Sequence, residues 1–267
     1  MVQQVSDVHA HLTHSEVIGY LAGTYDKEAR HIQILAAYPG RSISNDSDAH
    51  REAEMDPVYE VELRSRIESD GHTIVGWYHS HPTFQPVPSA VDVNNQRNYQ
   101  QLFHLDRRQS SPFVGLIVSP YNPSRPTTQS EFQWFYIEGT ATDPQAMTVE
   151  ASRTAITSES KLDLVQLKKQ ISGVLGAYAE DYLSIRVGFT DVWRQVGERV
   201  YTNMDKIVAS WRLHFKEHCD ANVDADAPSP KHATEQLDQL VKWLKRQCIA
   251  EIDIPPSPSA SPEKQQN

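Results

Sequence analysis

Cysteine is scarce in this chain of 267 residues, which contains only Cys219 and Cys248. Two thiols so far apart in the sequence cannot build a disulfide framework or a cysteine-based zinc site. We therefore expect an intracellular protein in a reducing compartment.

Long hydrophobic runs are also missing from the sequence. No apolar stretch approaches the roughly 20 residues that a membrane-spanning helix needs. The first ten residues lack the basic and then apolar layout of a signal peptide. These absences predict a soluble protein that is not secreted and has no membrane partner.

Basic charge is in deficit, because 25 Lys and Arg stand against 35 Asp and Glu and the net charge is -10. Proteins that bind nucleic acid nonspecifically neutralise its phosphates with a surplus of Lys and Arg. We therefore expect no direct binding to nucleic acid.

Apolar residues, at 39% of the chain, suffice for a domain of about 150 residues with an appendage. The patterns over residues 1–155 predict an α/β domain with a mixed β-sheet flanked by helices. Its strands are expected at residues 16–25, 31–38, 73–81, 113–119 and 132–137, and its helices at 5–14, 57–69 and 90–105. The polar segment 41–56 indicates an exposed insertion.

The character of the chain changes after about residue 155. Apolar residues recur at helical spacing over residues 162–178, 200–215 and 237–248, which predicts a helical C-terminal extension over residues 156–253. Residues 254–267 are rich in Pro and Ser, so we expect a disordered tail.

Two histidines end the expected strand 73–81. His79 and His81 are one residue apart, so the pleat directs both imidazoles to the same face. Asp92 lies in the first turn of the next expected helix, where the helix dipole favours a carboxylate. Two histidines and one carboxylate leave a tetrahedral zinc ion one position for water, whose pKa the metal would lower to about 7. A further carboxylate is needed to accept the proton of that water.

These residues resemble the JAMM or MPN-plus metalloprotease family. The family pattern is an upstream Glu, then His-x-His, seven residues, Ser, two residues and Asp. This chain carries it as Glu16, His79 to His81, Ser89 and Asp92. The surrounding segments EVIGYLAG, VGWYHSHP and IVSPYN also resemble the core strands of the family, most closely in its MPN domain-containing and histone-deubiquitinating members.

The resemblance implies the MPN fold, which is cytidine-deaminase-like, and hydrolysis of the isopeptide bond between the C-terminal glycine of ubiquitin and a lysine. It implies that His79, His81 and Asp92 hold one catalytic zinc ion, that Glu16 is the general acid and base, and that Ser89 stabilises the oxyanion. Residues 41–56 and 123–130 correspond to insertions that guide the ubiquitin tail. The resemblance also implies ubiquitin or ubiquitinated proteins as partners, with chromatin or a partner subunit bound through the C-terminal helices, and a nuclear or cytoplasmic location.

Several of these residues also have structural interpretations. Ser89 is a suitable helix N-cap, and Glu16 alone could be an exposed carboxylate at a strand edge. The histidines at positions 9, 11 and 14 are expected to be structural or solvated, and Trp77 and Tyr78 to pack in the core.

The motifs of the chain also bear on other functions. The alternative to an enzyme is a ubiquitin-binding or scaffold MPN module without robust activity. A zinc deaminase would need a Pro-Cys-x-x-Cys element, and a thermolysin-like peptidase a His-Glu-x-x-His motif, and the chain has neither.

Overall fold

The computed structural model describes residues 2–13, 15–42, 54–103, 112–124, 127–140, 142–152, 164–178, 188–221 and 230–249. Most of the expected insertion 41–56, the residue His14 and the expected tail 254–267 lie outside these ranges. None of the helices in these ranges combines the length and apolar character that crossing a membrane requires.

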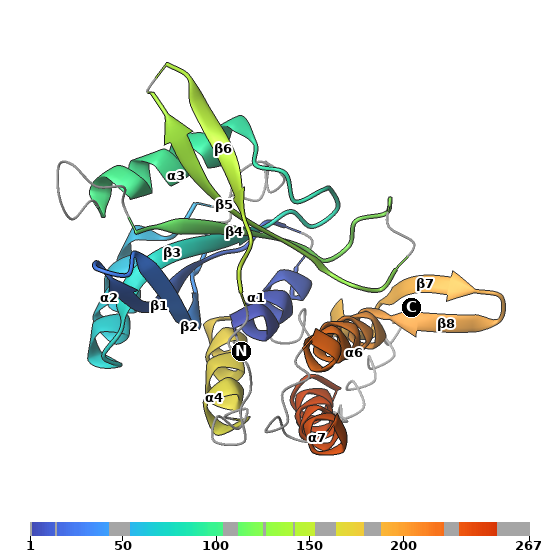
Figure 1. Ribbon diagram of the computed structural model, residues 1–267. Helices are drawn as coiled ribbons and strands as arrows, with labels where there is room; N and C mark the ends of the chain where they lie inside the picture. The colour runs from blue at the N-terminus through green and yellow to red at the C-terminus, as the bar shows by residue number, and fades with distance from the viewer. Residues whose placement is uncertain are drawn as a thin grey trace, which may run out of the picture.

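The described part of the chain is built on a mixed six-stranded sheet (Figure 1). Its strands, in spatial order, are β2 (His31–Pro39), β1 (Ile18–Asp26), β3 (Thr73–Ser80), β4 (Val114–Ser119), β5 (Glu131–Gly139) and β6 (Pro144–Val149). The β3 and β4 strands are parallel, whereas the other neighbouring pairs are antiparallel. The predicted mixed sheet is therefore confirmed.

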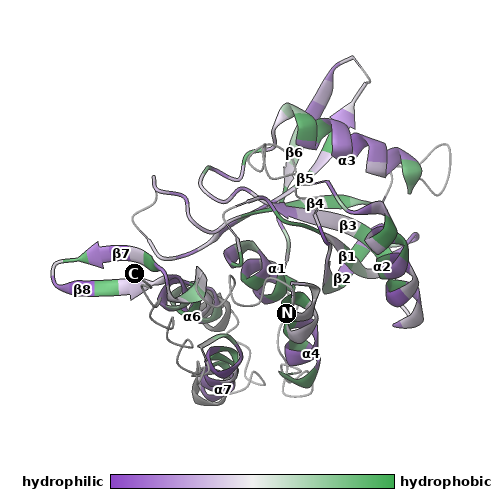
Figure 2. Ribbon diagram, turned by 180° about the vertical axis from the view of Figure 1, so that it is seen from behind, coloured by the Kyte–Doolittle hydropathy of each residue, from purple (hydrophilic) through white to green (hydrophobic). Residues whose placement is uncertain are grey.

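Helices cover both faces of this sheet (Figure 1). One face packs against α2 (Pro57–Ser69) and α3 (Ala90–Leu102). The opposite face packs against α1 (Val2–His11) and α4 (Leu164–Ala177), while α6 (Asn203–Ala221) packs beside α1, and α7 (Pro230–Ile249) packs against α4 and α6. Figure 2 shows apolar segments on α1 and α4, which contribute buried residues to the second core. The three helices of the C-terminal extension thus share a core with the sheet.

Local sequence signals set several boundaries. The Asp56 carboxylate accepts hydrogen bonds from the amides of Val58 and Tyr59, which caps α2, and Pro57 occupies its first turn. After α2, Gly71 adopts a φ of 77°, a left-handed conformation that favours glycine and ends the helix. The helix expected over residues 57–69 is therefore confirmed at both of its ends.

Three strands were not predicted. The β6 strand is an edge strand whose side chains are mostly exposed, so no apolar alternation marks it. The β7 (Val192–Val196) and β8 (Arg199–Thr202) strands form a separate hairpin inside the C-terminal extension, again with largely exposed side chains. Strands without a buried face lack the period-2 pattern that sequence analysis detects.

A buried histidine joins the sheet to the C-terminal extension. The two ring nitrogens of His9 lie 2.8 Å from the Tyr78 hydroxyl of β3 and 2.7 Å from the Tyr178 hydroxyl that follows α4. Because burial lowers the pKa of His9 to about 3, the ring is neutral and can donate one of these hydrogen bonds while accepting the other. His9 is thus structural, with no exposure to solvent.

This depressed pKa predicts how stability depends on pH. Unfolded His9 would titrate near 6.5, so between pH 6.5 and pH 3 the unfolded chain binds more protons than the folded one. The contribution of neutral His9 to the free energy of unfolding is complete above pH 6.5 and is lost as the pH falls toward 3. We expect this group to reduce the free energy of unfolding by about 2 kcal/mol between pH 6.5 and pH 5.

Denaturant unfolding of the wild type and of His9→Gln across that interval checks this expectation. Gln keeps a donor and an acceptor but cannot titrate, so the variant should decline less steeply with falling pH, whatever its absolute stability. Parallel declines in the two proteins would show that His9 does not titrate as described.

Candidate metal centre and active site

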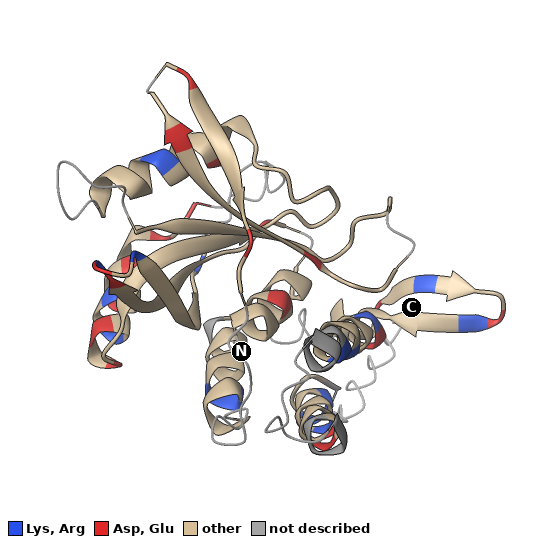
Figure 3. Cartoon of the chain, viewed as in Figure 1, with Lys and Arg blue, Asp and Glu red and all other residues tan. Residues whose placement is uncertain are grey.

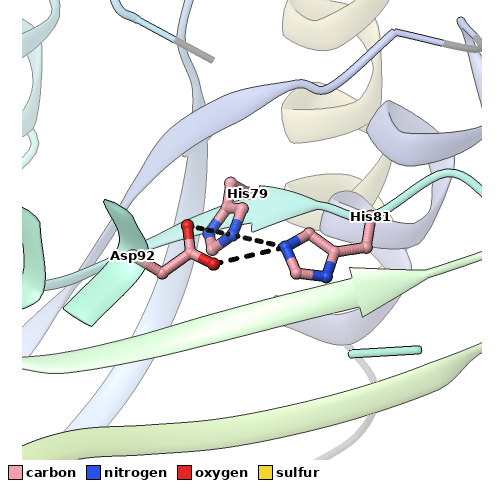
Figure 4. A group of neighbouring side chains, drawn as sticks. All are labelled: His79, His81 and Asp92. Atoms are coloured by element: carbon pink, nitrogen blue, oxygen red, sulfur yellow. Dashed lines mark hydrogen bonds and ion pairs between the residues drawn. The ribbon is translucent and has the colours of Figure 1, made fainter. Parts of the chain in front are cut away.

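The end of β3 directs alternate side chains to the two faces of the sheet. Trp77 packs in the core beneath α2 and α3, whereas Tyr78 packs in the core beneath α1. His79 follows Trp77 onto the α3 side, and the two rings are stacked with centroids 4.6 Å apart. The amide of His81 donates to the Val118 carbonyl of β4 over 2.9 Å, which fixes the backbone just after β3. Both imidazoles therefore point to the same side (Figure 4).

Asp92 reaches these histidines from the first turn of α3. The Ser89 hydroxyl accepts a hydrogen bond from the Asp92 amide at 3.1 Å, and the Ser89 amide donates to the Asp92 Oδ2 atom at 2.6 Å. This reciprocal capping box holds the carboxylate at the start of the helix. The predicted N-cap role of Ser89 is confirmed, and the same contact orients Asp92 toward β3.

Three potential metal-binding atoms converge at this point (Figure 4). The His79 Nε2 atom lies 3.0 Å from Asp92 Oδ1, the His81 Nε2 atom lies 3.4 Å from Asp92 Oδ2, and the two Nε2 atoms are 3.2 Å apart. Ligands of a tetrahedral zinc ion with bonds of 2.0–2.1 Å are separated by about 3.3 Å. The spacing of these three side chains therefore fits a metal ion of this kind.

The hydrogen bonding of His81 suits a metal as well. The Nδ1 atom of His81 lies 2.9 Å from the Gln85 carbonyl, which can only accept, so Nδ1 carries a proton and donates it. When the ring gives up its Nε2 proton to bind a metal, the Nε2 lone pair faces the other two side chains. The Nδ1 atom of His79 is buried without a hydrogen-bond partner among the described residues, whereas its Nε2 atom faces Asp92.

The electrostatics of this group favour positive charge. Burial alone would raise the pKa of Asp92, but hydrogen bonds from His79 and His81 hold it well below its usual range, so Asp92 is a carboxylate. Burial lowers the pKa of His79. Burial acts in the same direction on His81, but the Asp92 and Gln85 hydrogen bonds and the charges of Asp92 and Glu16 outweigh it and raise the pKa of His81.

Glu16 lies close enough for its charge to act on His81. It is half-buried in the segment between α1 and β1, immediately before Val17, whose main chain is hydrogen-bonded to Ser80. The amide of Val17 donates to the Ser80 hydroxyl at 2.9 Å, and the Ser80 amide donates to the Val17 carbonyl at 3.0 Å. The β1–β3 pairing thus brings a carboxylate distant in sequence next to the histidines.

The Ser89 side chain has capacity beyond capping. As the N-cap, its oxygen accepts one hydrogen bond, but a hydroxyl also carries one donor hydrogen. The residue is exposed, so this donor can reach a molecule bound beside Asp92.

Two glutamines that support the site were not identified from the sequence. Gln85 orients His81 through its main-chain carbonyl, which any residue provides, so its side chain gives no signal. The buried Gln96 side chain accepts from the Trp77 indole at 2.6 Å and donates to the Phe113 carbonyl at 2.9 Å, which locks α3 onto β3 and β4. Its position four residues after Asp92, on the same helix face, is the signal that could have found it.

No Asp, Glu, Lys or Arg occurs in β3 or β4, and both strands are tan along their length in Figure 3. The carboxylates beside the two histidines therefore come from elsewhere, Asp92 from α3 and Glu16 from the segment before β1. Of the segments expected to guide a substrate, residues 43–53, 125 and 126 lie outside the described ranges.

Comparison with known proteins adds independent information. Residues 1–104 match the family model described as JAB1/Mov34/MPN/PAD-1 ubiquitin protease. The MYSM1 protein of Xenopus laevis, named as a histone deubiquitinase, is 40% identical over 127 residues, which are 48% of this chain and 15% of that protein. A human MPN domain-containing protein is 35% identical over 131 residues, or 49% of this chain and 26% of that protein.

A longer match is found in Drosophila melanogaster, where the MPN domain-containing protein CG4751 is 31% identical over 193 residues, covering 71% of this chain and 13% of that protein. The chain thus spans a small part of the length of these relatives. A solved structure of a Desulfitobacterium hafniense protein covers 57% of this chain and 90% of that chain at 20% identity and a TM-score of 0.38, which is too weak a likeness to bear on function. The family match over residues 1–104 and the similarity to these relatives show that this part of the chain carries a domain of the JAMM/MPN family.

Proposed function

We propose that the protein is a zinc-dependent isopeptidase that removes ubiquitin from lysine side chains. The observation that carries this proposal is the convergence of two imidazoles and a carboxylate within 4.8 Å, with Glu16 close enough to act on His81. His79, His81 and Asp92 would hold the metal. A zinc ion there would supply a Lewis acid and lower the pKa of a bound water to about 7.

The side chains of the protein would then handle the protons. Glu16 accepts a proton from the attacking water and delivers it to the leaving lysine amine, which would otherwise depart as an unstable anion. Its half-buried setting beside the histidines places it for both transfers. Ser89 donates its hydroxyl hydrogen to the negative charge that develops on the carbonyl oxygen.

The relatives suggest the class of substrate. A matched relative is named as a histone deubiquitinase, so ubiquitinated chromatin proteins are the substrates that we propose to test first, with a nuclear location as the corollary. We assign catalysis to residues 1–155 and propose that the extension, residues 156–253, docks a partner subunit or chromatin.

A ligand set of this kind is costly in a protein that serves as a scaffold alone. The side chains of His79 and His81 are buried, and their Nε2 atoms face each other at 3.2 Å beside a carboxylate. Replacing such buried polar groups with apolar side chains of similar volume is often neutral or stabilising. Their presence at the spacing of a metal site therefore favours an enzyme over an inert module.

The most direct test incubates the purified full chain with ubiquitinated nucleosomes and with a panel of linked di-ubiquitins, each with and without a zinc chelator. We expect cleavage of at least one substrate, abolished by the chelator and restored by added zinc. Absence of cleavage in the zinc-loaded protein across all substrates would refute the proposal.

Glu16→Gln tests the proton carrier. The amide cannot accept a proton from water, so we expect cleavage to fall by at least about 100-fold while the zinc content is unchanged. Cleavage assays and elemental analysis measure the two quantities. Glu28→Gln, a matched change in the exposed turn between β1 and β2, should have no effect. Undiminished cleavage in Glu16→Gln would remove Glu16 from the mechanism.

Two further substitutions test the metal ligands. His79→Ala removes a ligand, and Asp92→Asn removes the charge while leaving a side-chain oxygen that can still cap α3. Both variants should retain their fold and lose most of their zinc, as measured by elemental analysis and circular dichroism. His31→Ala, at an exposed position on β2, is the matched control and should keep its zinc. Full zinc occupancy in the first two variants contradicts the assignment.

A further inference from the structure

A buried charged cluster joins α1 to α6, away from the two histidines of the proposed metal site. It contains Asp7 and His11 of α1, Lys206 and Ser210 of α6, and Ser130, which immediately precedes β5. Lys206 is 2% exposed, Asp7 0% and His11 3%. A lysine with so little contact with water is uncommon in proteins unless it is paired.

The hydrogen bonds of this cluster have one consistent direction. The Lys206 ammonium lies 3.2 Å from His11 Nε2 and 3.2 Å from the Ser130 hydroxyl, and an ammonium can only donate. His11 Nε2 is therefore the acceptor, and its Nδ1 atom carries the proton. That nitrogen lies 2.7 Å from the Asp7 carbonyl and 3.1 Å from the Asp7 carboxylate.

Charge balance supports this arrangement. Burial alone would raise the pKa of Asp7, but His11 and Lys206 lower it, so Asp7 is a carboxylate. Burial and the nearby Lys206 lower the pKa of His11, which keeps the ring neutral. Burial lowers the pKa of Lys206 to about 8 against the opposing attraction of Asp7. At neutral pH the cluster thus contains one carboxylate, one neutral imidazole and one ammonium.

The cluster is coupled to the segment that carries Glu16. His11 is the last residue of α1, and its carbonyl accepts a hydrogen bond from the Tyr121 hydroxyl at 3.1 Å. The Lys206 ammonium also lies over the Tyr121 ring, 5.6 Å from its centroid. The Tyr121 amide donates to the carbonyl of Pro82, the residue after His81, at 2.9 Å.

The main chain is therefore anchored on both sides of Glu16, at His11 and at Val17. At one end Lys206 and Tyr121 hold His11, and at the other end Ser80 pairs with Val17. Glu16 lies inside this short segment, one residue before the Val17 anchor. A change in the position of His11 therefore moves one of the two anchors between which Glu16 lies.

We propose that Lys206 of the C-terminal extension is a positioning residue for Glu16, which it acts on through His11 and the end of α1. The C-terminal extension then helps to set the position of Glu16 without contacting the substrate. This inference rests on the proposed isopeptidase function for its catalytic consequence, but the link between Lys206 and the segment 12–17 stands on the contacts alone.

Two variants separate positioning from stability. Lys206→Met keeps the length of the side chain but leaves the Asp7 carboxylate buried without a cation, so it should lower the melting temperature. Adding Asp7→Asn removes that uncompensated charge and should restore much of the melting temperature, while the hydrogen bond from position 206 to His11 remains absent. Ile207→Ala, a buried apolar neighbour on α6, is the control for simple loss of packing.

Three quantities are measured on the full zinc-loaded chain: the melting temperature, the kcat and KM for the best di-ubiquitin or nucleosome substrate, and amide hydrogen exchange in peptides covering residues 12–17. In the double variant we expect kcat to fall about 10- to 100-fold at unchanged KM. Exchange in the segment should rise about tenfold or more. The control should lose melting temperature with kcat and this exchange unchanged.

A double variant that recovers both the melting temperature and kcat would overturn the proposal, because Lys206 would then act on stability alone. Unchanged exchange in residues 12–17 would overturn it too, whether or not the protein cleaves any substrate. If the unmodified chain cleaves nothing, the isopeptidase proposal fails separately, and the exchange comparison alone decides for or against the link from Lys206.

Discussion

The strict alternation of side chains at the end of β3 is the constraint on which the rest of the structure depends. Trp77, His79 and His81 follow one another on the α3 side, whereas Tyr78 and Ser80 contact α1 and the segment before β1. A slip of one residue would send both imidazoles into the opposite core. The parallel β4 strand and the anchored α3 helix prevent such a slip, because each makes hydrogen bonds to this short stretch.

Two of the buried polar groups of the site, His81 and Asp92, are oriented by a main-chain or capping contact. Gln85 fixes the tautomer of His81, and the capping box fixes the carboxylate of Asp92. In surroundings this dry, an isolated carboxylate would tend to take up a proton, but the two imidazoles keep Asp92 ionised. The same attraction that lowers the pKa of Asp92 favours a divalent cation between the three side chains.

The α1 helix links the sheet to the C-terminal extension. His9 bridges Tyr78 of the sheet and Tyr178 after α4, and His11 contacts Lys206 of α6. One apolar core runs from the sheet through α1 to α4, α6 and α7. The extension therefore shares the core of the domain. This arrangement explains why polar contacts join residues that are distant in sequence, such as His11 and Lys206, which are 195 positions apart.

The sequence by itself determined the features that depend on short spacing. The His-x-His pair, the Ser89 to Asp92 capping box, the Asp56 start of α2 and the main strands follow from local geometry and apolar period, and all are seen in the structure. Tertiary structure alone decided how Gln96 locks α3 and that Lys206 and Asp7 share a buried cluster. It also decided the exposed β6, β7 and β8 strands. The reason is that these features depend on packing between distant segments or lack a buried face, and neither condition leaves a periodic mark on the chain.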